Sequence, residues 1–170
     1  MGKCLCLCLA ILLCLCACQG PAPAQTGQEP TVPYQDEQNR LGLVVNGVCR
    51  YTVVRPEVAS EQVLAAARSV DSHLFVRHGV HIPVHNDFAP VLPLEILVGH
   101  TNRPETARVL ATLSPGQYAV RRVGDKVVLC GYGDAETALA VEDFLARFVD
   151  NAPVATEEAP NLLLLLSPWA

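Results

Sequence analysis

The chain contains few basic residues and few aromatic residues. Its 170 residues include 12 Lys and Arg against 17 Asp and Glu, and no basic run is longer than the pair Arg121-Arg122. Phosphate contacts need clustered cations, so the composition argues against a nucleic-acid partner. Aromatic residues make up only 5% of the chain, which offers little material for stacking on sugars. The length is also below the roughly 200–250 residues that a TIM barrel requires.

Motifs for catalysis and for cofactor binding are missing as well. No Gly-x-Ser-x-Gly segment supplies a hydrolase nucleophile. The turn Gly131-Tyr132-Gly133 lacks the third glycine of the dinucleotide fingerprint, since Glu136 stands there, and we interpret it as structural. Asp87 and Glu95 could form a carboxylate pair, but Glu95 lies in an apolar strand and is expected to face an edge or to pair with an arginine. We therefore predict no catalytic residue, no enzymatic activity and no cofactor.

Cysteine is abundant, but most of it lies at one end. Six of the eight cysteines fall within the first 18 residues. Residues 4–17 are an uninterrupted run of apolar side chains and thiols, preceded by Lys3. A run of about 14 residues is short for a membrane-spanning helix but suits the apolar part of a secretory signal. We predict a signal peptide over residues 1–17.

The end of this run, Leu15-Cys16-Ala17-Cys18, consists of an aliphatic residue, a tolerant position, a small residue and a cysteine. This pattern resembles the signal of bacterial lipoproteins. The resemblance implies cleavage after Ala17 and attachment of lipid, including palmitate, to Cys18. Several acyl chains would hold the protein on the cell membrane, facing outside the cytoplasm. Two alternatives stay open: a soluble secreted protein with an ordinary Cys18, and a eukaryotic chain acylated near Met1-Gly2, although Cys6 stands where that motif has Ser or Thr.

The rest of the chain divides into three parts. Residues 18–38 are rich in Pro, Gln, Gly, Thr and acids and are predicted to form a flexible tether. Residues 39–150 are predicted to form one domain, which is long enough to bury a core. Residues 151–170 are a tail that contains five leucines, 162–166. This leucine run is too short to cross a membrane and is interpreted as an edge strand, a docking segment or an aberrant end.

Hydrophobic patterning predicts the element order ββαβαββα. Asn46-Gly47 predicts a hairpin between strands 41–45 and 48–54. Ser60 and Gly79 are expected to begin and end the first helix. The further expected elements are an extended edge or connector over 80–84, a buried strand over 94–99, a helix capped by Asn102, a hairpin of 117–123 with 126–130, and a helix capped by Asp134. Together they predict an α/β (α+β) domain, a mixed β-sheet with about three helices packed on it.

The stretch from Tyr51 to Val149 is similar to the small domain that precedes the barrel in family 20 β-hexosaminidases and some α-glucuronidases, and to bacterial lipoprotein domains of that kind. The segments that carry this resemblance are Tyr51-Thr52-Val53-Val54, Glu95-Ile96-Leu97-Val98-Gly99, Thr101-Asn102-Arg103-Pro104-Glu105, Tyr118-Ala119-Val120-Arg121, Val127-Val128-Leu129-Cys130-Gly131 and Thr137-Ala138-Leu139-Ala140-Val141. It implies a non-catalytic accessory domain, which could bind a glycan or a partner protein or act as a scaffold. In those enzymes the catalytic residues lie on the following barrel, so the chain is expected to be a stand-alone version or the first part of a longer enzyme.

Two side-chain groups invite other interpretations. His78, His81 and His85 could make a metal-binding surface segment, the third candidate function. Gly79 and Pro83 interrupt this segment, and a solvated loop explains the three histidines more simply. Cys49 and Cys130 are the only cysteines in the predicted domain. Export would permit a disulfide between them, but two separate buried thiols are the preferred interpretation.

Overall fold

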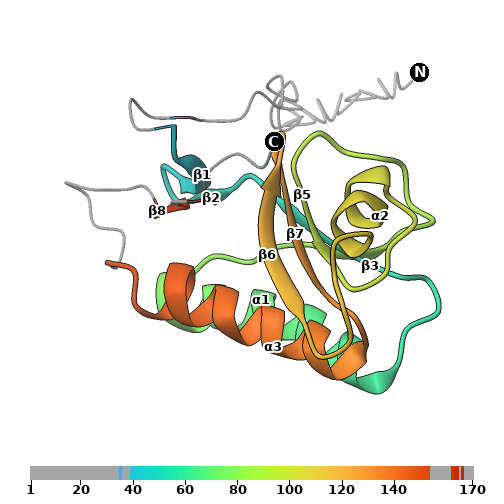
Figure 1. Ribbon diagram of the computed structural model, residues 1–170. Helices are drawn as coiled ribbons and strands as arrows, with labels where there is room; N and C mark the ends of the chain where they lie inside the picture. The colour runs from blue at the N-terminus through green and yellow to red at the C-terminus, as the bar shows by residue number, and fades with distance from the viewer. Residues whose placement is uncertain (1–34, 36–38, 154–161, 165, 167–170) are drawn as a thin grey trace, which may run out of the picture.

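The computed structural model describes residue 35, residues 39–153, residues 162–164 and residue 166. These residues form two β-sheets and three α-helices (Figure 1). The predicted signal, Cys18 and most of the predicted tether and tail lie outside the described residues. Among the helices described, none combines the length and the apolar character needed to cross a bilayer.

The main sheet has five strands in the order β4-β3-β5-β7-β6. The strands are β3 (Thr52–Arg55), β4 (Val84–Asn86), β5 (Glu95–Val98), β6 (Tyr118–Val123) and β7 (Lys126–Gly131). Four of them run parallel, and β6 is antiparallel to β7. The predicted mixed sheet is confirmed, and β4, which follows Pro83, lies at its edge, where a missing backbone donor is tolerated.

A second, antiparallel sheet has the order β2-β1-β8. It consists of β1 (Leu41–Val45), β2 (Val48–Cys49) and β8 (Leu162–Leu164). Asn46 and Gly47 take φ values of 52° and 75°, so the predicted hairpin turn is confirmed. The leucine run supplies an edge strand, one of its three interpretations.

The expected element order ββαβαββα is wrong, since β4 lies between α1 and β5 and β8 follows η1. The expectation of one continuous strand over residues 48–54 is wrong as well. The strand breaks at Arg50 and Tyr51, between β2 and β3. Tyr51 is buried, and its hydroxyl donates to the carbonyl oxygen of Asp125 at 2.9 Å. This contact fixes the break, because it ties Tyr51 to the β6–β7 turn while the hairpin pairs with β8 away from the main sheet.

Helices cover both faces of the main sheet (Figure 1). On one face lie α1 (Glu61–His78) and α3 (Asp134–Leu145), which continues into one turn of π-helix, η1 (Ala146–Asp150). On the other face lies α2 (Pro104–Leu110). The larger apolar core, with Phe144, fills the α1–α3 side, and a smaller one, with Val109, fills the α2 side.

The ends of α1 follow the sequence, but the other two N-termini differ from expectation. Ser60 Oγ accepts from the Val63 N–H at 3.2 Å, and Gly79, at φ 70°, closes the helix. Asn102 does not cap α2; the N-cap is Arg103, because the Asn102 amide instead donates to the Asp87 carbonyl oxygen at 2.9 Å.

In α3, Asp134 is the first helical residue and Gly133 is the N-cap. The Gly133 N–H donates to the carboxylate of Glu136 at 3.1 Å. The Glu136 side chain therefore accepts a backbone N–H at the start of α3, where Asp134 was expected to be the cap.

Candidate functional site

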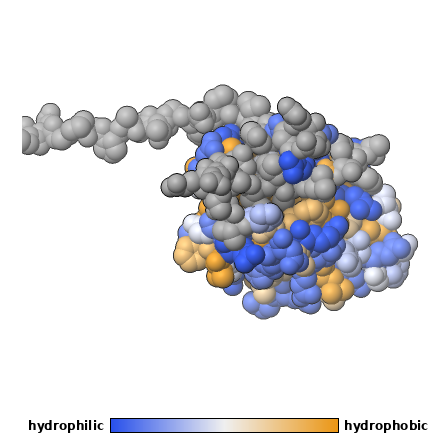
Figure 2. All heavy atoms as spheres, turned by 90° about the vertical axis from the view of Figure 1, so that its left-hand side faces the viewer, coloured by the Kyte–Doolittle hydropathy of each residue, from blue (hydrophilic) through white to orange (hydrophobic). Residues whose placement is uncertain are grey.

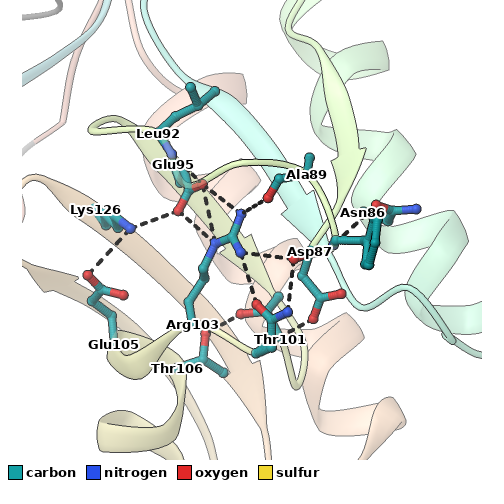
Figure 3. A network of polar contacts seen from close by, with 12 residues as sticks. Asn86, Asp87, Ala89, Leu92, Glu95, Thr101, Arg103, Glu105, Thr106 and Lys126 are labelled. Carbon is teal, nitrogen blue, oxygen red and sulfur yellow. Dashed lines mark hydrogen bonds and ion pairs between the residues drawn. The ribbon is translucent and has the colours of Figure 1, made fainter.

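A buried network of charges lies on the α2 side of the main sheet (Figure 3). Glu95, the first residue of β5, is 0% exposed. Its carboxylate accepts from Lys126 Nζ at 2.8 Å and from Arg103 Nη2 at 3.1 Å. Lys126 also lies 3.4 Å from the carboxylate of Glu105 in the first turn of α2. Two anions and two cations thus alternate, and the pairing of Glu95 with an arginine is confirmed.

The protonation state of Glu95 follows from these partners. Burial alone would raise the pKa of its carboxyl. The carboxylate also accepts from the Leu92 N–H at 2.9 Å. The hydrogen bonds from Leu92, Lys126 and Arg103 outweigh the effect of burial and hold the pKa of Glu95 below its ordinary value of 4.5. Glu95 is therefore an anion at neutral pH and is poorly suited to act as a general acid.

The network fixes the backbone of the connection between β4 and β5. The Arg103 guanidinium donates to the carbonyl oxygens of Asp87 and Ala89, both at 2.9 Å. The Asp87 carboxylate accepts from the N–H groups of Glu57 at 2.8 Å and of Asn102 at 2.7 Å. These bonds join the segments that follow β3, β4 and β5. The carboxylates of Asp87 and Glu95, which the sequence suggested as a pair, thus accept from different donors, and Arg103 contacts both residues.

The clamped connection carries an exposed apolar run, residues 88–93, which we call the apolar loop. Phe88 is 80% exposed, Val91 62% and Leu92 41%, and Pro90 and Pro93 are exposed as well. A surface run of several apolar residues is unusual in a soluble domain unless it meets a partner.

A groove of about 510 Å³ lies between α1 and α3, on the opposite side of the sheet. Its apolar part consists of small and medium side chains: Ala65, Ala66, Ala138, Val141 and Leu145. Its polar rim consists of Gln62, Ser69, His73, Glu142 and Asp150. His73 Nδ1 lies 2.8 Å from the Asp150 carboxylate and joins α1 to η1. Figure 2 views the side on which both helices end, where apolar patches are separated by hydrophilic residues.

The three histidines of the suggested metal segment have different partners. His78 Nε2 lies 3.1 Å from the carbonyl oxygen of Val149. His81 Nδ1 lies 3.0 Å from Asp71, and its ring stacks on Phe75 at 4.3 Å between centroids. His85 is an exposed residue of β4. Within the described part of the chain, no group of three His, Cys, Asp or Glu side chains is placed to hold a metal ion.

The two domain cysteines are both free thiols. Cys49 is half-buried, and its Sγ lies 3.7 Å from the carbonyl oxygen of Tyr51. Cys130 is buried in the α2-side core. Burial raises the pKa of Cys49 to about 11 and that of Cys130 to about 12, so both are poor nucleophiles at neutral pH.

The Gly131-Tyr132-Gly133 turn has a packing role. A Cβ on Gly131 would stand 2.3 Å from the backbone carbon of Glu136, so only glycine lets β7 end this close to α3. The Gly131 N–H donates to Thr137 Oγ1 at 3.0 Å. These contacts support the interpretation of this segment as a structural turn.

Sequence reasoning did not identify Arg103 and Lys126 as partners of Glu95. Arg103 belonged to an expected helix start, and Lys126 to an expected hairpin, so neither position suggested burial. Sequence reasoning did not single out the apolar loop either, because an apolar run with two prolines does not by itself indicate exposure. In comparisons with known proteins, no protein-family model and no curated protein sequence matches the chain.

Proposed function

We propose that the protein is a lipoprotein anchored through Cys18 to the cell membrane, and that its domain acts by binding rather than by catalysis. The proposal includes the accessory role that the resemblance to carbohydrate-active enzymes implies. The observation that supports it best is that the buried charges of Glu95, Arg103 and Lys126 are used to hold backbone and one another.

The groove between α1 and α3 is the surface that we assign to a protein partner. The α3–η1 side of the groove is acidic, since it contains five acidic residues and one basic residue, whereas α1 contains two of each. The acids are Asp134, Glu136, Glu142, Asp143 and Asp150, and the base is Arg147. A partner segment with apolar side chains for the alanine-rich part and with Lys or Arg for the rim complements this surface.

The lipid anchor is tested by growth of a bacterium that produces the chain with radiolabelled palmitate. We expect label on the full-length protein and on a Cys16→Ala variant, and none on Cys18→Ala. Cys16 is a matched control, because it lies two residues away in the same apolar run. Label that persists in Cys18→Ala would contradict the anchor.

The binding surface is tested with a synthetic amphipathic peptide of Leu and Lys, and with a second peptide in which Glu replaces every Lys. We expect the full chain to bind the Lys peptide and Glu142→Lys to lose that binding. Asp143→Lys introduces the same charge at the next position, which does not line the groove, and should lose less. Equal effects of the two substitutions would show that the groove is not the binding surface.

A further inference from the structure

The apolar loop exposes Phe88, Val91 and Leu92 although its backbone is held rigidly. The buried Arg103 guanidinium donates to the carbonyl oxygens of Asp87 and Ala89. The Leu92 N–H donates to the buried carboxylate of Glu95. A flexible loop could fold its apolar side chains inward, but a clamped one cannot. The domain therefore presents a fixed apolar surface, and such surfaces bind with a low entropic cost because they are already ordered.

The Leu92 end of the apolar loop lies near the point where the N-terminal segment of the chain reaches the domain, and this position indicates what the loop contacts. Gln35 donates to the Asp125 side chain at 3.2 Å, so the chain enters beside the β6–β7 turn. The next residue after Asp125, Lys126, bonds to Glu95, and Glu95 bonds to the Leu92 N–H. The entry point of the chain and the Leu92 end of the apolar loop thus lie at the same end of the main sheet, the one where β5 and β7 begin. Phe88 follows β4 and lies toward the other end of these strands.

The distance to the proposed anchor is compatible with close approach. About 16 residues separate Cys18 from Gln35, and a chain of that length spans at most about 55 Å. Lipid attachment at Cys18 would therefore keep the loop at a high local concentration near the bilayer, where even weak apolar contacts are populated.

The distribution of charged residues favours an orientation in which the α2 side of the domain faces the membrane. The acidic outer surface of α3 and η1 lies on the face of the sheet opposite to α2. The α2 side carries exposed Arg108 and Arg121. A bilayer with anionic lipids would attract the α2 side and repel the α3 side.

We infer that the apolar loop docks on the lipid bilayer to which the chain is attached, so that the groove between α1 and α3 faces away from the membrane. This inference rests on the proposed anchor and adds a second, peripheral contact. Docking transfers Phe88, Val91 and Leu92 from water into the headgroup and acyl boundary, as the apolar faces of interfacial segments do.

The test measures the depth of residue 92 in vesicles of phosphatidylethanolamine and phosphatidylglycerol. The full chain is purified with its lipid, with Trp169→Phe to remove its one Trp and Leu92→Trp as the probe. We expect brominated lipids to quench this tryptophan several-fold more than a control tryptophan in Val76→Trp. Val76 is a matched site, since it is 85% exposed on α1, on the opposite face.

Substitution of the neighbouring residues gives a second readout. In the Leu92→Trp background, Phe88→Ser and Val91→Ser should each lower the ratio of docked to undocked protein about tenfold. Val58→Ser, also strongly exposed but outside the loop, should leave it unchanged. Equal quenching at positions 92 and 76, or no effect of the serines, overturns the inference. An emission shift that depends on protein concentration in the absence of lipid would instead indicate a second copy as the partner and would also overturn it.

The outcomes separate the inference from the anchor. If palmitate labelling at Cys18 fails while the probe at position 92 is still quenched, the anchor is wrong and the docking stands. If labelling succeeds while the probe at position 92 is not quenched, the anchor stands and the docking is wrong.

Discussion

Removal of the charge of Glu95 tests the buried network directly. Glu95→Gln keeps the shape of the side chain and an oxygen that can accept from the Leu92 N–H. It removes the anion that lies 2.8 Å from Lys126 and 3.1 Å from Arg103. Those two cations are only 10% and 4% exposed as side chains, so they lose their partner in a site that water hardly reaches.

The magnitude follows from this burial. Breaking a buried ion pair typically costs about 3–5 kcal/mol. Lys126 keeps Glu105 at 3.4 Å, and Arg103 keeps its two carbonyl partners, so we expect the lower end, about 3 kcal/mol of unfolding free energy. With a typical slope of about 1–3 kcal/mol per molar urea, the midpoint should fall by roughly 1–3 M.

The assay is urea unfolding followed by circular dichroism, with Asp143→Asn as control. Asp143 pairs with Arg147, but their side chains are 29% and 49% exposed, so its loss should cost no more than about 0.5 kcal/mol. If Glu95→Gln costs less than about 1 kcal/mol, or no more than the control, then the charges are not buried against one another in solution and the reasoning fails.

Three further predictions concern pH, packing and metal. Because the folded pKa of Glu95 lies below 4.5, its contribution is fully present above about pH 4.5 and is lost as the pH falls through the folded pKa; urea midpoints should fall less steeply below pH 4.5 in Glu95→Gln than in the original chain. Gly131→Ala should cost about 1–3 kcal/mol in the same assay, because its Cβ meets backbone at 2.3 Å, whereas Gly133→Ala meets only the flexible end of Glu136 at 2.9 Å and should cost less. Calorimetric titration with zinc should give the same heat for the full chain and for His81→Ala; a loss of heat in the variant would restore the metal interpretation.

Local sequence signals predicted turns and helix ends better than they predicted how distant parts of the chain pair. Asn46-Gly47, Ser60 and Gly79 act through their own backbone conformation or a bond to a near neighbour, so the sequence alone was sufficient. The break at Tyr51 depends on a hydroxyl bond to a residue 74 positions away. Pairing at that separation leaves no periodic pattern in the sequence, and the run of β-branched residues around it predicted one strand instead of two.

The candidate site was harder to predict for the same reason. Glu95 was recognised as a carboxylate in an apolar strand, but its partner Lys126 lies 31 positions away on a strand that aligns beside it only after folding. The exposure of the apolar loop could not be predicted either. Hydrophobic residues normally indicate burial, whereas the backbone of this run is bonded to Arg103 and Glu95 while its side chains face solvent.

The clamp also explains why charges occupy a position that apolar side chains could fill. Buried ion pairs are often no more stabilising than well-packed apolar residues of similar volume. Apolar residues in place of Glu95 and Arg103, however, could not bond to the carbonyl oxygens of Asp87 and Ala89 or to the amide of Leu92. When the side chains of a loop face solvent, its inward-facing N–H and C=O groups need polar partners from the interior of the domain. The network therefore holds the backbone of the apolar loop in place while its side chains face solvent.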